Sequence, residues 1–282
     1  MKGTKKRGLR GRRLLGTAAL LSVLAVLLSG DPPASAVPRD GASAEAPTAQ
    51  EPVRARVLEP APPAEPEEPP ASEEPAKPDT MLVPECAPVE DDYFSDTVFL
   101  GDSRTEGFYL YSGLEEGTYL YAVGATVESV FTKPTQTTDA GKVPMLDALA
   151  DMECGKVYIM LGVNELGWPR TETFRDQYGK LIDRVRADHP DAQVVIQSIL
   201  PVSAEQDAKG SYVNNRRIQE FNDVLRELAE EKNCSYLNVA EAVTGEDGCL
   251  LPELTSDGVH LNTKGCAVWR EYLMSHPVTK AL

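Results

Sequence analysis

A buried strand followed at once by a helix is predicted by Thr97-Val-Phe-Leu-Gly-Asp-Ser-Arg-Thr-Glu-Gly107. Ser103 stands at the junction between these two elements. A serine at such a junction has its backbone amide at a helix N-terminus, which is a favourable place for a developing negative charge. The simpler alternative is a serine that only caps the helix.

Short apolar runs and amphipathic stretches alternate from about Met81 onward. Further buried strands are predicted at 119–123, 156–161, 193–200 and 235–239. Helices are predicted from about 103 and at 144–152, 171–187, 212–231 and 263–274. Because the strands are mostly apolar and alternate with helices, they predict a parallel sheet covered on both faces. The expected fold class is α/β, a three-layer α/β/α sandwich with a five-stranded parallel sheet of the flavodoxin-like kind, over residues 86–282.

The N-terminal part of the chain predicts export. Residues 1–36 begin with basic residues, continue with an apolar run at 14–29 and offer Ala34-Ser-Ala36 to a signal peptidase. An uncut membrane anchor is the alternative, although the run is somewhat shorter than the roughly 20 residues of a spanning helix. Residues 37–85 are rich in Pro, Ala and Glu and predict a disordered linker. We therefore expect an extracytoplasmic domain, secreted or membrane-anchored, that contacts a membrane only through its N-terminal segment.

Charge and cysteine content limit the partners of the domain. The formal net charge is -16. No basic stripe is left in the predicted domain, so we expect no nucleic-acid partner. The cysteines are Cys86, Cys154, Cys234, Cys249 and Cys266. Their odd number leaves at least one unpaired or shared between molecules, and their spacings match no zinc-binding pattern.

One of the three histidines is a candidate for catalysis. His260 follows Asp257 by three residues in a loop that opens the last predicted helix. An Asp and a His at this spacing on a turn can face one another, so that the carboxylate holds one ring nitrogen and the other faces a substrate. A capping Asp beside an unrelated His is the alternative. His189 and His276 each precede a proline and are expected at the surface and in the tail.

Two more candidates close predicted strands. Gly124 follows the second strand, where a glycine allows a ligand to approach the backbone and leaves its amide free to donate, although a turn glycine gives the same pattern. Asn164 follows the third strand and is either a side-chain donor or a turn former. Sites in parallel sheets form at the carboxyl ends of strands, so these residues and Ser103 can meet at one rim.

In this order, Gly101-Asp-Ser103, Gly124, Gly162-Val-Asn164 and Asp257-Gly-Val-His260 resemble the sequence blocks of the SGNH/GDSL hydrolase family. The resemblance spans about residues 95–275. It implies a carboxylic ester hydrolase with Ser103 as nucleophile, His260 as its base and Asp257 orienting the histidine. It also implies an oxyanion hole made by the amides of Ser103 and Gly124 and by the side chain of Asn164.

Two positions depart from the family pattern. Glu165 stands where the family often has Asp, and Arg104 follows the serine where apolar residues are common. Both are candidates for substrate binding, and surface capping is the alternative for Arg104.

The implied reaction is hydrolysis through an acyl-serine, which requires neither a metal nor an organic cofactor. No extended apolar segment suggests a lipase lid, so we expect short acyl esters, with acetyl groups on a cell-surface glycan as the first candidate. The alternatives are an acyltransferase with the same triad and an inactive carbohydrate-binding domain.

Overall fold

The computed structural model describes residues 81–278. The predicted export segment therefore lies outside the described residues, as does most of the predicted linker. Leu82 forms a bridge with Tyr236, and the amide of Val83 donates to the carbonyl of Tyr236 at 3.0 Å. Leu82 and Val83, which precede the predicted boundary at residue 86, thus already contact the domain.

Five parallel strands form the central sheet, in the order β2-β1-β5-β6-β7. They are β1 (Thr97–Gly101), β2 (Thr118–Tyr121), β5 (Lys156–Met160), β6 (Gln193–Gln197) and β7 (Ser235–Leu237). The predicted α/β fold class with a five-stranded parallel sheet is confirmed. A separate antiparallel hairpin of β3 (Pro134–Thr138) and β4 (Gly141–Pro144) is not predicted from the sequence.

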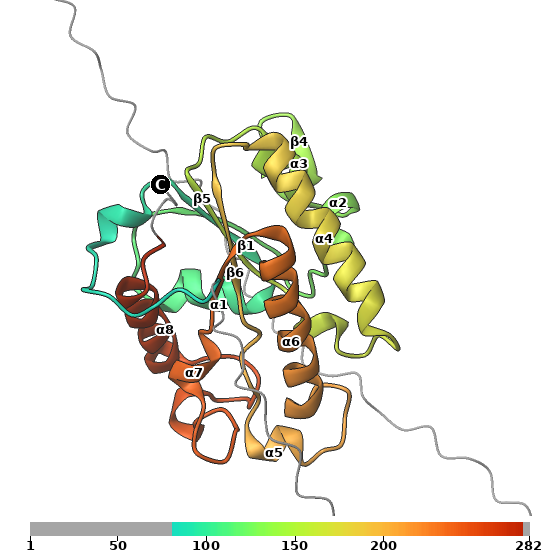
Figure 1. Cartoon of the computed structure of the whole chain (residues 1–282), viewed down its shortest axis with the longest axis vertical. Coiled ribbons are helices and arrows are strands. Elements are labelled where there is room, and N and C mark those ends of the chain that lie inside the picture. The colour runs from blue at the N-terminus through green and yellow to red at the C-terminus, as the bar shows by residue number, and fades with distance from the viewer. Residues whose placement is uncertain (1–80, 279–282) are drawn as a thin grey trace, which may run out of the picture. The chain divides into compact units, whose positions relative to one another are not determined.

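Two helical layers cover the sheet. The helices are α1 (Ser103–Tyr111), α2 (Ser129–Thr132), α3 (Met145–Ala150), α4 (Thr171–Asp188), α5 (Ala204–Asp207), α6 (Asn215–Lys232), α7 (Ala240–Val243) and α8 (Thr263–Ser275). Figure 1 shows α4 and α6 on one side of the sheet and α8 on the other. Short 3-10 helices occur at Asp91–Phe94, Val163–Glu165 and Pro252–Leu254.

Alternation along β1 divides the core between the two layers. Val98 and Leu100 belong to the apolar cluster that includes α3, α4 and α6, whereas Phe99 belongs to the cluster that includes α1 and α8. Successive side chains of a strand point to opposite faces, so an apolar run without interruption is what two covered faces require. All five residues of β1 are buried.

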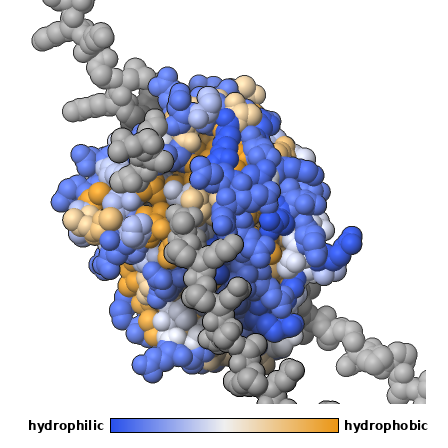
Figure 2. Space-filling view, in the orientation of Figure 1, coloured by the Kyte–Doolittle hydropathy of each residue, from blue (hydrophilic) through white to orange (hydrophobic). Residues whose placement is uncertain are grey.

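The outer surface of the domain is polar over α4 and α6, as Figure 2 shows. Arg175 of α4 pairs with Glu227 and Glu231 of α6, and Lys232 pairs with Asp183. Within residues 81–278, no helix has the length and apolarity needed to cross a membrane.

Two histidines near helix ends are buried, and for His189 this contradicts the expected surface position. His189 is 9% exposed and bonds to the carbonyl of Leu149 at 3.0 Å, so it is a buried residue and not a surface one. His276 is 8% exposed and stacks on Tyr272. In each case, the proline beside the histidine marks the end of a helix but does not show whether that end packs against the core.

Candidate active site

Ser103 is the first residue of α1, directly after the carboxyl end of β1. Asp102 caps this helix, because its Oδ1 accepts a hydrogen bond from the amide of Arg104 at 2.8 Å. A cap of this kind satisfies one of the free amides at a helix start and fixes the angle at which the helix leaves the strand. The Ser103 side chain therefore stands at the sheet rim, on rigid elements.

A continuous hydrogen-bond relay connects Ser103 to a carboxylate. Ser103 Oγ lies 2.9 Å from His260 Nε2, and His260 Nδ1 lies 2.7 Å from Asp257 Oδ2. The relay joins the start of α1 to a loop 157 residues further along the chain. The structure thus brings together the three residues that the resemblance singled out, in the order nucleophile, base and orienting acid.

Local hydrogen bonds hold the loop that carries Asp257 and His260. Asp257 Oδ1 accepts from the amides of Val259 and His260, both at 2.8 Å. Partial burial raises the pKa of Asp257, but the hydrogen bonds from His260 and Val259 outweigh this effect, and the net shift is downward. Asp257 is therefore a stable carboxylate at neutral pH, as the orienting acid of a triad needs to be.

Gly258 allows this loop to sit close to the segment after β6. Its φ of +83° is unfavourable for residues with a side chain, and an added Cβ would lie 2.6 Å from Ser203 Oγ. The amide of Ser203 donates to the carbonyl of Gly258 at 2.9 Å, which ties the two segments together. The turn between Asp257 and His260 thus depends on a glycine at its second position.

The two remaining oxyanion candidates lie on adjacent loops. Gly124 has a φ of +72° and is exposed, and the space beside its Cα is open. Asn164 lies in the 3-10 helix Val163–Glu165, and its Nδ2 donates to the carbonyl of Ala125 at 2.8 Å. A second, longer contact of 3.4 Å joins this nitrogen to Asp102 Oδ2. One N–H of Asn164 therefore holds the turn after Gly124, and the other makes only the longer contact to Asp102, the residue before Ser103.

Glu165 does not contact the open side of the site. It is fully buried, and its Oε1 accepts from the amide of Val127 at 2.6 Å. Burial raises its pKa to about 8, so that the group is mainly protonated at neutral pH. In place of the predicted substrate contact, Glu165 makes a buried hydrogen bond that holds the loop of residues 124–127.

Arg104 is also buried, with 3% of its surface exposed, which rules out the surface-capping alternative. Its Nη1 donates to the carbonyl of Leu200 at 2.8 Å. Burial lowers the pKa of Arg104 to about 10, although the nearby Asp102 and Asp257 favour the charged form. The guanidinium therefore remains charged at neutral pH and provides a fixed positive charge behind the relay, out of direct reach of a substrate in solution.

Asp102 is the residue that sequence reasoning missed. It is 1% exposed, and it connects the cap of α1, the charge of Arg104 and the side chain of Asn164. Burial raises its pKa, while Arg104 acts in the opposite direction. A polar residue directly before a helix that starts with the candidate nucleophile is the signal that could have found it.

Neither a metal cluster nor a disulfide is found in the described part of the chain. Among residues 81–278, no three His, Cys, Asp or Glu side chains are grouped as metal ligands. All five cysteines lie in this part, and each is a free thiol.

The fold and the rim define the protein as a carboxylic ester hydrolase. Residues 99–268 match the model of the GDSL-like lipase/acylhydrolase family, and because the match covers more than half of the chain, the protein belongs to this family. The predicted family and enzyme class are thereby confirmed.

Known relatives agree with this assignment. The chain is similar to the isoamyl acetate-hydrolyzing esterase of Saccharomyces cerevisiae, with 22% identity over 198 residues, or 63% of this chain and 83% of the relative. A solved structure from Streptococcus pneumonia has 24% identity and a TM-score of 0.51, covering 63% of this chain and 81% of that chain. An acetyl xylan esterase has 16% identity and a TM-score of 0.51, covering 64% of this chain and 99% of that chain. The two structural similarities concern the fold.

Proposed function

We propose that this protein is an extracytoplasmic serine esterase that hydrolyses short acyl esters, above all acetyl esters on carbohydrate. Ser103 is the nucleophile, His260 the general base and Asp257 the orienting acid. The observation that carries the proposal is the unbroken relay of 2.9 Å and 2.7 Å from Ser103 Oγ through the imidazole to Asp257. These distances lie within the reach that proton transfer needs.

The reaction starts with proton transfer. A serine hydroxyl is a weak nucleophile at neutral pH, so His260 Nε2 accepts its proton as Ser103 Oγ attacks the ester carbonyl. Asp257 stabilises the imidazolium that results. His260 then returns the proton to the departing alcohol, which leaves an acyl-serine. A water molecule, deprotonated by the same imidazole, then attacks the acyl carbon. The bond from this carbon to Ser103 Oγ breaks, His260 returns the proton to Ser103 Oγ, and the carboxylic acid leaves.

The oxyanion of each tetrahedral intermediate needs donors that are already in place. The amide of Ser103 lies at the N-terminus of α1, and the exposed Gly124 brings its amide to the same rim. The weakly held N–H of Asn164 is the third donor. Moving this N–H from a 3.4 Å contact to a full oxyanion costs little and gains a charge-assisted hydrogen bond in the transition state.

Two observations support the acetyl substrate and the location. The yeast relative is named for an acetate ester, and the acetyl xylan esterase shares the fold. The N-terminal residues 1–36 have the order of an export signal or membrane anchor, and this order supports an extracytoplasmic site of action. Fractionation of the cells that make the protein tests the location, with the culture medium or the membrane fraction expected and the cytoplasm as the contrary result.

The decisive test is hydrolysis of p-nitrophenyl acetate by the parent enzyme, Ser103→Ala and His260→Ala. We expect both variants to lose at least about 10⁴-fold in kcat. Ser256→Ala changes an exposed serine in the triad loop and is the matched control, with activity close to the parent. Full activity in Ser103→Ala would remove the assignment, and acetyl transfer to an added sugar in place of free acetate would favour the acyltransferase.

A further inference from the structure

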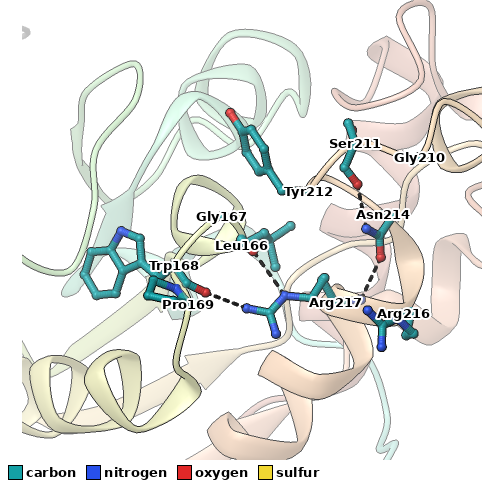
Figure 3. Close-up of a pocket in the computed structure, with 10 residues that line it drawn as sticks. All are labelled: Leu166, Gly167, Trp168, Pro169, Gly210, Ser211, Tyr212, Asn214, Arg216 and Arg217. Carbon is teal, nitrogen blue, oxygen red and sulfur yellow. Dashed lines mark hydrogen bonds between the residues drawn. The ribbon is translucent and has the colours of Figure 1, made fainter.

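A pocket of about 350 Å³ lies beside the Asn164 segment. One wall is formed by residues 166–169, which directly follow the 3-10 helix Val163–Glu165, and the other by residues of 210–214. The first turn of α6 closes the base with Arg216 and Arg217 (Figure 3).

Both walls are connected to the catalytic segments. Because successive Cα atoms are about 3.8 Å apart, Gly167 lies within about 11 Å of Asn164. On the other side, Gln206 Nε2 donates to Ser211 Oγ and to the carbonyl of Val213, both at 3.2 Å. Gln206 also packs beside Gly258, since a Cβ added there would lie 3.3 Å from Gln206 Cβ. The two walls of the pocket are therefore joined to the segment that carries Asn164 and to the loop that carries Asp257 and His260.

The first wall is braced in its present shape. Arg217 Nε donates to the carbonyl of Leu166 at 3.1 Å, and its Nη2 donates to the carbonyl of Trp168 at 2.8 Å. The same guanidinium pairs with Glu220. A wall that is fixed before binding loses little conformational entropy when a ligand arrives.

The walls present aromatic surface together with polar groups. Tyr212 is 62% exposed, and its ring lies against Gly167, where an added Cβ would be 3.3 Å from the ring. Figure 3 shows the Tyr212 ring extending from its loop above Leu166 and Gly167, with the Trp168 indole further along the same wall. An exposed ring bordered by hydrogen-bonding groups suits a sugar, whose ring has apolar C–H faces and hydroxyl edges.

The pocket continues into a second hollow of about 540 Å³, which shares Pro169 and Arg217 with it. The second hollow follows the start of α4 and one side of α6, and leads away from Asn164. The charged side chains along both hollows are Arg170, Glu172, Arg216, Arg217, Glu220, Asp223 and Glu227. This mixture of signs offers no continuous field to a polyanion and favours a polar, uncharged chain.

We propose that these two hollows form one groove, the 166–227 groove, that binds an uncharged polysaccharide segment on the alcohol side of the ester. The acyl group of a sugar held against Tyr212 reaches Ser103, and the neighbouring sugars occupy the hollow beside α4 and α6. This inference rests on the proposed esterase function and adds to it a polymeric, neutral glycan as substrate.

The test compares a polymeric and a minimal substrate in the full enzyme. For Tyr212→Ala, we expect the ratio of kcat/KM for O-acetylated xylo-oligosaccharides to kcat/KM for p-nitrophenyl acetate to fall about 3- to 10-fold, mainly through KM. Tyr212→Phe retains the ring and is expected to restore the ratio. Tyr111→Ala removes an exposed tyrosine of α1 and is the matched control, with an unchanged ratio. An unchanged ratio in Tyr212→Ala, or no hydrolysis of the oligosaccharides by an enzyme active on p-nitrophenyl acetate, overturns the groove assignment.

Binding to the Ser103→Ala variant separates this inference from the esterase assignment. We expect calorimetry to detect binding of neutral xylo-oligosaccharides to Ser103→Ala and much weaker binding of polygalacturonate. Adding Tyr212→Ala is expected to weaken the binding of the neutral oligosaccharides. Tighter binding of the anionic polymer overturns the choice of an uncharged chain. The parent enzyme could lack activity on p-nitrophenyl acetate and still bind the neutral oligosaccharide through Tyr212. That result would contradict the esterase proposal but keep the groove assignment.

Discussion

Two regions of the candidate site are held in different ways. One is the loop that carries Asp257 and His260, and the other is the rim that carries Asn164 and Glu165. In the triad loop, the bonds are local: Asp257 accepts from two amides within three residues of itself and from the imidazole of His260. Both side chains remain about half exposed, at 55% for Asp257 and 44% for His260. Both side chains are therefore accessible to a substrate and to water.

The Asn164 rim is held by contacts between distant segments. Asn164 reaches Ala125 across 39 positions of sequence and Asp102 across 62, and Glu165 reaches Val127 across 38. Asp102 and Glu165 are almost fully buried, where hydrogen bonds are not weakened by competition with water. In the proposed mechanism the two regions have different roles: the exposed, locally held loop transfers protons, and the buried network positions the donors for the oxyanion.

The largest effect on kcat is expected from a substitution that removes the charge of the triad loop but keeps its local hydrogen bonds. Asp257→Asn keeps the oxygen that accepts from Val259 and His260 but loses the carboxylate that orients and stabilises the imidazolium. We expect kcat for p-nitrophenyl acetate to fall by about 10³–10⁴-fold with little change in the melting temperature. Asp191→Asn, at an exposed aspartate, is the control. Nearly full activity in Asp257→Asn would mean that His260 is oriented by other groups.

A smaller effect is expected when the buried rim loses its donor. Asn164→Ala removes the bond to Ala125 and the third oxyanion donor, and we expect kcat to fall about 10²–10³-fold while KM changes little. The control is Asn238→Ala, which truncates an asparagine far along the chain from this rim. If the loss appeared in KM alone, Asn164 would only be shaping the pocket through the Gly124 turn.

The same division explains how much could be predicted from the sequence. The strand-to-helix junction at Ser103 and the Asp257–His260 spacing are local patterns, and the five apolar strands carry their own signal. Asn164 could be named as a donor from its place after a strand, but the contacts that join it to Ala125 and Asp102, and Glu165 to Val127, connect residues dozens of positions apart and leave no spacing to recognise. Glu165 was accordingly expected at the substrate and was found beneath the loop.

Other differences have the same physical origin. The β3–β4 hairpin starts with Pro134 and is half exposed, so it lacks the apolar run that marked the central strands. The walls of the 166–227 groove come from two loops. Arg217 holds the first through the carbonyls of Leu166 and Trp168, and Gln206 holds the second through the carbonyl of Val213. In loops, conformation is set by such tertiary bonds more than by residue preference.

The smallest effect on activity, and the clearest pH dependence, is expected from the buried acid beneath the rim. Because the pKa of Glu165 is raised from 4.5 to about 8, the folded protein holds a proton that the unfolded chain releases above pH 4.5. The contribution of this group to stability is therefore full below pH 4.5, declines as pH rises and is lost above about pH 8. We expect Glu165→Gln, which cannot ionise, to flatten this decline in urea unfolding followed from pH 5 to pH 9, while Glu115→Gln at an exposed position leaves it unchanged. An equally steep decline in Glu165→Gln would show that another group titrates, and that the buried rim is held without a proton on Glu165.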